Sequence, residues 1–297
     1  MPMNYDHYRV FLAVAKLGSL TKAAEELYTS QPAITRTIKN LESDLGVKLF
    51  SRSKKGVALT REGELLYSHV SAAFSLLNKA ESEIASSLTL QSGSITFGAT
   101  VTALDECLFS LIEGFKDLYP GVKYKIASKS SDNTVAMLRA GEIDLAFITT
   151  PYKKVDDVIE KVLKEFDNIF ICGPGFQELM SGTHHIKDLA KYPLVYLSSA
   201  MQLRQYCDET FRSHGVSVTP TIELDSASTI LPMVEKNLGI GIVPRSLASE
   251  ALKAGRVYQI KTIEPLPERE VIMLKSAVYP ETAPVKRFYE FARKYQF

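Results

Sequence analysis

The feature that most constrains the fold is a series of three short helical patterns at the start of the chain. Residues 4–17 have apolar side chains at helical spacing, Gly18 ends that pattern, and residues 22–27 form a second short helical segment. Ser30 can cap a third helix, with Pro32 in its first turn. One stripe of this helix is apolar: Ile34, Ile38, Leu41 and Leu45. Three helices, the last two joined by a very short turn, predict a helix-turn-helix.

The opposite face of the third helix is polar and has no acidic residue. It presents Gln31, Thr35, Arg36 and Lys39. Gln and Arg can form paired hydrogen bonds with base edges, whereas Thr and Lys suit phosphates or thymine methyl groups. An ordinary solvated helix face is the alternative interpretation, because most charged helix faces are only that.

The segment that follows favours the nucleic-acid interpretation. Val47 to Leu59 has two short apolar runs around a basic turn, which predicts a β-hairpin with cations at its tip. From Gln31 to Arg61 the chain has seven Lys and Arg residues, but only Glu42 and Asp44 as acids. The formal charge of the whole chain is only +1, so this basic character is local. A basic helix beside a basic hairpin is typical of duplex binding.

A single long helix is expected from residue 60 to residue 90. Its apolar residues alternate in steps of four and three, which is the spacing of a coiled-coil seam. They are Leu66, Val70, Ala73, Leu77, Ala80 and Ile84. Packing on the helix's own domain is the alternative, but a partner chain is the better fit. We therefore expect a homodimer, whose paired reading heads would bind dyad-related half-sites in double-stranded DNA.

Beyond residue 91 the pattern changes to strands that alternate with helices, which predicts α/β layers. Strands are expected at 94–99, 122–128, 143–148, 194–197, 220–224 and 240–243. Two groups of three strands indicate two lobes, with lobe I formed by 91–162 and 267–297 and lobe II by 163–266. The fold class is thus α+β overall: a winged helix-turn-helix (1–59), a linker helix (60–90) and a two-lobed α/β domain (91–297).

Composition and motifs exclude several other classes of protein. No window is long and apolar enough for a membrane span, and the N-terminus lacks the pattern of a secretory signal. The three cysteines are far apart and form no zinc or disulfide pattern. No hydrolase, metalloprotease, P-loop or dinucleotide motif is present, so we expect no catalytic residue, metal or cofactor. A cytoplasmic protein that is not an enzyme is the plain interpretation.

At this point residues 19–66 resemble the LysR-type transcriptional regulators. The segments AAEEL, SQPAITRTIKNLE, LGVKLF and LTREGE follow the order of that family's N-terminal signature almost without gaps. The resemblance implies a winged helix-turn-helix, a dimerising linker helix and a periplasmic-binding-protein-like effector domain. It also implies assembly as a dimer of dimers, and promoters with a T-N11-A core.

The resemblance assigns DNA-binding roles to the matching positions. Bases and adjacent phosphates are expected to meet Gln31, Pro32, Ala33, Thr35 and Arg36, with Lys39 on the same face. Ser30 and Thr21 are expected to meet backbone phosphates, because hydroxyl groups at helix N-termini suit anions. Arg52, Lys54 and Lys55 lie in the hairpin, which in the family reaches a minor groove.

The effector site is expected between the two lobes, where strands end and helices begin. These positions are hydroxyl residues: Thr100, Thr102, Ser130, Ser131, Thr149, Ser198, Ser199 and Ser226. Helix capping alone explains many such residues, and a capped N-terminus is also a seat for an anion. We expect a small, hydrogen-bonding effector that carries a carboxylate. No cation occurs among these positions, which argues against a highly charged ligand.

Two other functions are compatible with parts of the chain. A two-lobed domain is also typical of solute-binding proteins, although the basic helix-turn-helix argues against that function. A thiol redox sensor could use Cys172 and Cys207 of the second lobe, as the peroxide-sensing branch of the family uses cysteines. Buried, unreactive thiols are the commoner case.

Overall fold

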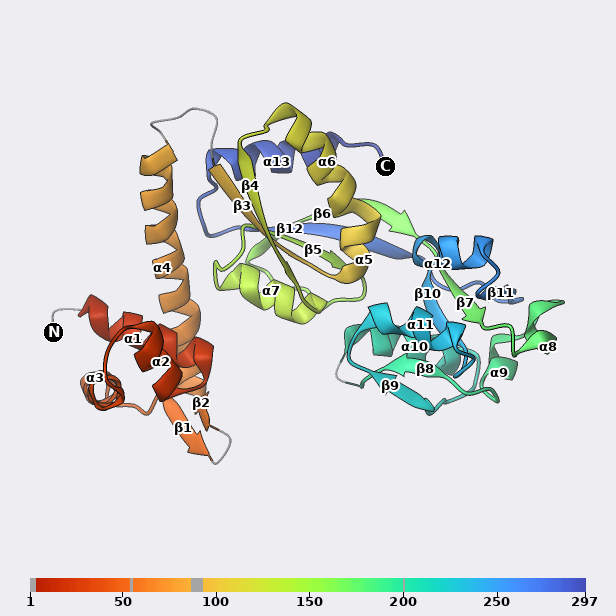
Figure 1. Ribbon diagram of the computed structural model, residues 1–297, viewed down its shortest axis with the longest axis horizontal. Helices are drawn as coiled ribbons and strands as arrows, with labels where there is room; N and C mark the ends of the chain where they lie inside the picture. Colours follow the sequence, from red (N-terminus) through yellow and green to blue (C-terminus); the bar gives the residue numbers. More distant parts are fainter. Residues whose placement is uncertain (1–3, 54–55, 87–92, 200) are drawn as a thin grey trace. The chain divides into compact units, whose positions relative to one another are not determined.

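The computed structural model describes residues 4–53, 56–86, 93–199 and 201–297 (Figure 1). The chain divides into two compact units, one within Met1–Ala85 and Arg139–Glu142, the other within Ser86–Leu138 and Ile143–Phe297. No helix in the described ranges is long and apolar enough to cross a membrane.

The first unit contains a helix-turn-helix, a hairpin and a long helix. Its elements are α1 (Tyr5–Leu17), α2 (Leu20–Glu26), α3 (Gln31–Leu45), β1 (Phe50–Ser53), β2 (Gly56–Leu59) and α4 (Arg61–Ser86). The expected order of three helices, a hairpin and a linker helix is confirmed. The two strands pair antiparallel, with Phe50 opposite Leu59. Residues 87–90 of the expected linker helix lie outside the described residues.

Local capping explains where these helices begin and end. The Ser30 hydroxyl accepts a hydrogen bond from Ala33 N at 3.4 Å, and Gly46 ends α3 with a φ of 71°. Ser19 caps α2 by accepting from Lys22 N, while Thr21 lies inside that helix and is exposed. Thr21 is therefore not a capping residue.

The core of this unit is formed by one face from each of the three helices. Phe11, Ala23, Ile34, Ile38 and Leu41 are buried together in it. Leu45, which was expected in the same stripe, is 41% exposed, so that part of the prediction is wrong. It is the last residue of α3, where the helix runs past the core.

The expected seam of α4 divides into two parts within the single chain. Leu66 packs against the helix-turn-helix core and Val70 is buried. Farther along, Ala73 and Ala80 are exposed, and Leu77 is 48% exposed. The side chain of Ile84 is outside the described part of the structure. Only the second half of the seam is thus available to another chain.

Lobe I of the second unit is built on a five-stranded sheet with the order β4-β3-β5-β12-β6. Its elements are β3 (Gly93–Ala99), α5 (Val101–Ala103), a π-helical turn η1 (Leu104–Leu108), α6 (Phe109–Leu118), β4 (Val122–Ser128), α7 (Ser131–Arg139), β5 (Leu145–Thr149), β6 (Val158–Phe166), β12 (Arg269–Ser276) and α13 (Ala283–Lys294). The strands β4, β3 and β5 are parallel, as expected, whereas β12 runs antiparallel to both of its neighbours.

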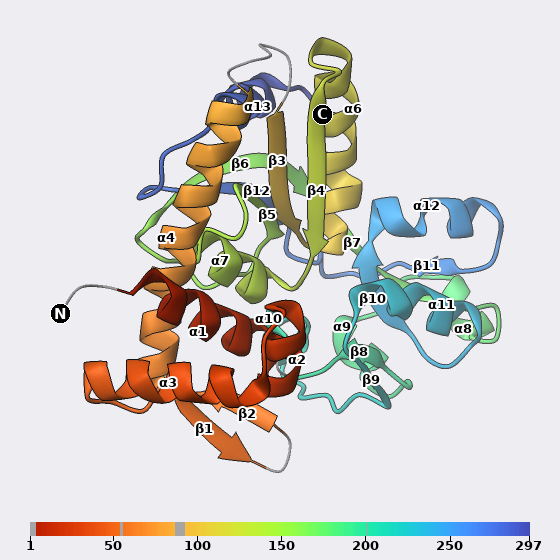
Figure 2. The same ribbon diagram turned by 60° about the vertical axis from the view of Figure 1, so that its left-hand side comes forward.

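Successive side chains of β5 and β12 point to opposite faces of this sheet. Phe147 and Met273 belong to the cluster under α6 and α13, while Ile148 and Ile272 belong to the cluster under α7. Figure 2 shows α6 and α7 on opposite sides of the sheet. The central strands β3, β5 and β12 are therefore largely buried on both faces, and the ends of the parallel strands open toward the cavity described below.

Lobe II has a three-stranded sheet, β10-β7-β11, and a separate parallel pair, β8 and β9. Its elements are β7 (Asn168–Cys172), α8 (Gln177–Met180), α9 (Ile186–Leu189), β8 (Val195–Leu197), α10 (Gln202–Arg212), β9 (Ile222–Leu224), a 3-10 turn η2 (Ala227–Thr229), α11 (Ile230–Glu235), β10 (Gly241–Pro244), α12 (Arg245–Lys253) and β11 (Tyr258–Ile260). The three strands expected here correspond to β8, β9 and β10: β8 and β9 pair parallel, and a parallel bridge joins Leu194 to Ile240. The strand β7, which was not among them, is antiparallel to both β10 and β11.

The crossing between lobes also differs from the expectation. The strand β6 pairs with β12 up to Phe166, whose buried ring belongs to the core of lobe I. The boundary expected at residue 162 is therefore wrong, and the chain enters lobe II at Asp167. The return crossing lies between Ile260 and Arg269, as expected.

Candidate DNA-binding face and effector cavity

The polar face of α3 is exposed, as its sequence indicates. Gln31 Nε2 donates a hydrogen bond to Thr35 Oγ1 at 3.0 Å, so these two side chains form a pair on the helix surface. Arg36 and Lys39 are exposed and have no ion-pair partner among the described residues. Pro32 and Ala33 are also exposed, in the first turn. This face has free donors and uncompensated charge, which an approaching polyanion can use.

The turn before α3 has one feature that the pattern of apolar residues did not indicate. Tyr28 has a φ of 51°, a conformation that favours glycine or asparagine, and it is 98% exposed. Thr29 N donates to Ala24 O at 2.9 Å, which holds the chain in the short turn. An aromatic side chain thus stands beside the start of the exposed helix.

Glu42 connects α3 to the hairpin through hydrogen bonds. The sequence pattern did not indicate this role of Glu42. Its Oε1 accepts from Leu49 N at 2.9 Å and its Oε2 accepts from Lys48 Nζ at 2.7 Å. The carboxylate is buried. Burial opposes its ionisation, but the hydrogen bonds from Lys48, Leu49 and Phe50 outweigh burial and hold the pKa of Glu42 below its ordinary value. Lys48, whose side chain is 76% exposed, is therefore ion-paired with a buried carboxylate, in contrast to Arg36 and Lys39.

We expect Glu42→Gln to destabilise the first unit by about 1–2 kcal/mol, because it replaces charge-assisted hydrogen bonds with neutral ones. The depressed pKa gives a pH signature. The stabilisation from the Glu42 charge is fully present above the pKa of Glu42 in the unfolded chain, near 4.5. It disappears as the pH falls through the lower pKa of Glu42 in the folded chain. Urea unfolding should therefore show the parent and the variant converging in acid. A constant difference across that range would contradict the role of the charge.

Only part of the expected basic hairpin, the wing of the winged helix-turn-helix, is described. Arg52 lies in β1, and its backbone pairs with that of Val57. Lys54 and Lys55, expected at the tip, lie outside the described residues.

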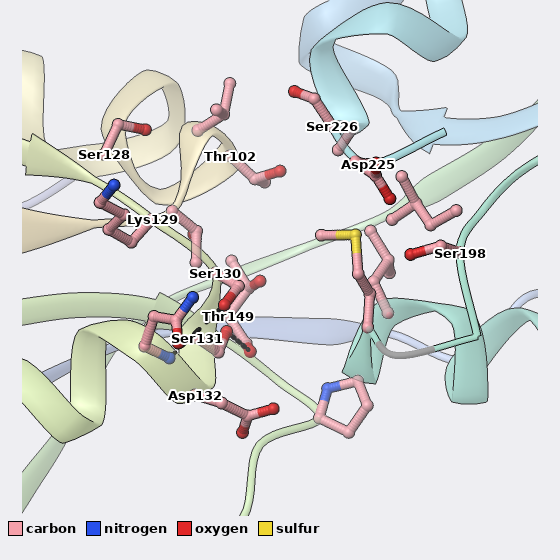
Figure 3. A pocket seen from close by; sticks show the side chains of 18 of the residues that line it. Thr102, Ser128, Lys129, Ser130, Ser131, Asp132, Thr149, Ser198, Asp225 and Ser226 are labelled. Atoms are coloured by element: carbon pink, nitrogen blue, oxygen red, sulfur yellow. Dashed lines mark hydrogen bonds between the residues drawn. The ribbon is translucent and has the colours of Figure 1, made fainter. Parts of the chain in front are cut away.

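A cavity of about 620 Å³ lies between the lobes of the second unit (Figure 3). It is lined by seven of the eight expected hydroxyl residues: Thr100, Thr102, Ser130, Ser131, Thr149, Ser198 and Ser226. Figure 3 shows Thr102, Ser130 and Thr149 facing Ser198 and Ser226 across it. Ser199 does not line the cavity. It lies in the turn that follows β8, in which Met201 N donates to Ser198 O at 3.0 Å.

Most of these hydroxyl groups already have partners within the chain. Thr100 Oγ1 caps α5 by accepting from Ala103 N at 3.3 Å, and Ser131 Oγ donates to Thr149 O at 3.3 Å. Ser130 and Ser226 have internal hydrogen bonds as well. Thr102 and Ser198 have no side-chain partner in the described ranges. The capping interpretation thus holds for part of the set, and two hydroxyls, one from each lobe, remain free for a ligand.

The expected hydroxyl positions contain no cation, but Lys129 and Arg269 also line the cavity, so the argument against a highly charged ligand does not hold. Arg269 begins β12, far along the chain from the strand ends that the prediction used. Its Nη2 donates to Thr149 Oγ1 at 2.7 Å, and its guanidinium lies 5.1 Å from the centre of the Phe166 ring. Burial lowers the pKa of Arg269 to about 10, which leaves it charged at neutral pH. Strand periodicity could not predict this cation in the cavity, because Arg269 follows an irregular segment of the chain.

The cysteines do not have the properties of redox sensors. Burial raises the pKa of Cys172 to about 11 and that of Cys207 to about 12. Cys107 is also buried. A peroxide-reactive thiol needs a lowered pKa and access to solvent, so these residues fit the inert, structural role.

A chain with a helix-turn-helix that has an exposed basic face, and with a two-lobed domain that has a polar cavity, is typical of DNA-binding regulators. Residues 5–64 match the family described as "Bacterial regulatory helix-turn-helix protein, lysR family", and residues 89–296 match "LysR substrate binding domain". The chain belongs to the LysR family of DNA-binding transcriptional regulators.

Relatives and solved structures agree with this assignment. The chain is 28% identical to the transcriptional regulator CfxR of Cupriavidus necator, over 84% of this chain and 78% of that protein. It is also 28% identical to the regulator GltR of Bacillus subtilis, over 86% and 84%. The crystal structure of CbnR, a LysR family transcriptional regulator, superposes with a TM-score of 0.72 at 20% identity, over 98% of this chain and 99% of that one. These relatives are transcriptional regulators, not enzymes.

Proposed function

We propose that this protein binds promoter DNA with dyad-related half-sites, and that a small-molecule effector between its lobes modulates the binding. The observation that supports the effector most strongly is the meeting of hydroxyl groups from both lobes around one cavity. A ligand that bridges the lobes would favour one lobe arrangement. We expect the ligand to be small, to form hydrogen bonds and to carry a carboxylate.

On the DNA side, Gln31 and Arg36 are proposed to meet base edges, supported by Pro32, Ala33, Thr35 and Lys39. The exposed, uncompensated face of α3 supports this assignment. Ser30 and Thr21 are proposed to meet phosphates, and the wing residues Arg52, Lys54 and Lys55 a minor groove. A structure of CbnR "complexed with the target DNA complex" superposes with a TM-score of 0.70 at 21% identity, over 98% of this chain and 99% of that one, a likeness of fold.

The test of modulation combines ligand binding with DNA binding. A thermal-shift screen of metabolic carboxylates and amino acids should find a compound that raises the melting temperature, because a ligand of the folded state stabilises it. The same compound should change the affinity for promoter DNA in fluorescence anisotropy, by about 5- to 150-fold. A stabilising compound that leaves DNA affinity unchanged would contradict the proposed modulation.

Thr102→Val and Ser198→Ala are each expected to weaken binding of such a compound by about 5- to 10-fold. Each removes one free hydroxyl, and a hydrogen bond contributes about 1 kcal/mol. Ser199→Ala is the matched control, since Ser199 is adjacent in the chain but does not line the cavity. Equal effects of Ser198→Ala and Ser199→Ala in calorimetric titrations would show that the ligand binds elsewhere.

Assembly through α4 into a homodimer, and from dimers into a dimer of dimers, is the remaining part of the proposal. Leu77 is 48% exposed at the centre of the available seam, so Leu77→Glu should bury an unpaired carboxylate in the dimer. Analytical ultracentrifugation is expected to show a smaller species. Asn78→Glu adds the same charge at the next exposed position, off the seam, and should leave the mass unchanged. An unchanged mass for Leu77→Glu would mean that other surfaces hold the oligomer together.

A further inference from the structure

The two walls of the inter-lobe cavity have opposite charges, which bears on the kind of ligand that fits. Arg269 lines it from lobe I and Asp225 from lobe II. Asp225 follows the end of β9, beside Ser226 and across from Thr102 (Figure 3). A ligand long enough to touch both walls therefore meets a cation at one end and an anion at the other.

Arg269 is a buried cation without a counterion. Only 3% of the residue is exposed, and no carboxylate lies within ion-pair distance of its guanidinium in the described part of the chain. Its hydrogen bonds go to Thr149 Oγ1 and to the Thr150 carbonyl oxygen, which are neutral acceptors, and its Nη1 has no partner among the described residues. A buried charge is costly unless it is paired. An anionic group in the cavity would supply the missing partner, and a carboxylate matches the fork of a guanidinium.

Asp225 is the complementary group on the opposite wall. Its carboxylate is exposed, and no hydrogen bond or ion pair joins it to any residue in the described ranges. The nearby Ser198 hydroxyl is also free within these ranges. A carboxylate and a free hydroxyl on one wall suit an ammonium group, which donates up to three hydrogen bonds.

The other two charged residues of the lining do not alter this polarity. Lys129 and Asp132 both come from lobe I, are both exposed and have opposite signs. Figure 3 shows the amino end of Lys129 turned away from Asp225. Together the two residues add no net charge to the lobe I wall, whose remaining charged residue is the buried Arg269.

We propose that the effector is a small zwitterion, an amino acid or a similar amino carboxylate, whose carboxylate pairs with Arg269 and whose ammonium group pairs with Asp225. This inference rests on the proposed effector function and specifies the ligand of the same cavity. A zwitterion that spans the two charges would also couple the lobes, because its two ends bind to different lobes. A ligand with a single charged end would hold only one wall.

The test uses the full-length protein and matched sets of probes. Each set contains an amino carboxylate, the same compound without its amino group and the same compound without its carboxylate; the sets range from α-amino acids to amino carboxylates whose two charged groups are at opposite ends of the chain. Thermal shift and calorimetric titration should show that at least one amino acid binds about 10-fold or more tightly than both of its counterparts, as expected for loss of one charge-assisted contact. If a carboxylate binds as tightly as its amino acid, the zwitterion inference is overturned while the effector proposal stands. If no probe of any set binds, both fail.

Variants of the two walls separate the ends of the ligand. Asp225→Asn should reduce affinity for the amino acid about 10-fold and leave affinity for the carboxylate counterpart unchanged. Asp188→Asn, at an exposed lobe II position that does not line the cavity, is the matched control and should change neither. Arg269→Gln should remove binding of both compounds. Because Arg269 is buried, Arg269→Lys serves as a second variant that keeps the charge and should retain part of the affinity. Unchanged selectivity in Asp225→Asn would overturn the assignment.

Discussion

Gly63→Ala is expected to destabilise the first unit by about 3 kcal/mol, the largest effect of any single substitution considered for this unit. Gly63 lies in the first turn of α4, where alanine would ordinarily stabilise a helix by about 1 kcal/mol. Here a Cβ atom would overlap the carbonyl oxygen of Leu49 and lie 3.0 Å from a methyl group of Leu59. A backbone atom cannot rotate away, so the steric cost outweighs the gain in helix propensity.

Hydrogen exchange of the amides in α3 and α4 measures this effect without interference from the second unit. Gly46→Ala is a useful contrast, because its Cβ would have no heavy atom within 4 Å but would occupy a φ of 71°. That variant should cost only about 1–2 kcal/mol of backbone strain. If Gly63→Ala stabilises the unit, or costs less than Gly46→Ala, the close packing of α4 on the hairpin is incorrect.

Arg36→Ala should weaken binding to a specific promoter site by about 1–3 kcal/mol, or about 5- to 150-fold, and relax specificity at one position of each half-site. The physical reason is the loss of a paired contact from a guanidinium that is exposed and without an ion-pair partner among the described residues. Fluorescence anisotropy with the specific site and with random DNA measures both effects. Arg9→Ala removes an equivalent charge from the exposed side of α1 and should affect the two DNAs equally and weakly. Equal losses for Arg36→Ala on both DNAs would rule out base contact.

Local rules were sufficient for much of the fold and the site. The start of α3 at Ser30 and its end at Gly46 could be predicted, because capping depends on residues within one turn of each other. The cavity hydroxyls could be found because strand ends and helix starts converge between the lobes, and Thr102 and Ser198 lie where that rule places them. Ser199 does not follow this rule, because it lies in the turn after β8 rather than at the strand end.

Contacts between distant segments could not be predicted in this way. Glu42 reaches backbone groups of the hairpin, and only the folded chain shows that it forms an ion pair with Lys48. Arg269 joins the cavity through the return strand β12, which has no sequence proximity to the other lining residues. The expected seam of α4 was half intramolecular, because Leu66 faces the helix-turn-helix core at a spacing that also fits a coiled coil.

We propose that α3 reads dyad-related promoter sites. A genome-wide binding map compares the parent protein with Arg36→Ala. We expect the parent to occupy discrete sites upstream of genes, with a shared dyad that contains the T-N11-A core implied by the family resemblance, and the variant to lose them at equal protein abundance. Occupancy without a shared dyad, or an identical map for Arg36→Ala, would contradict the account.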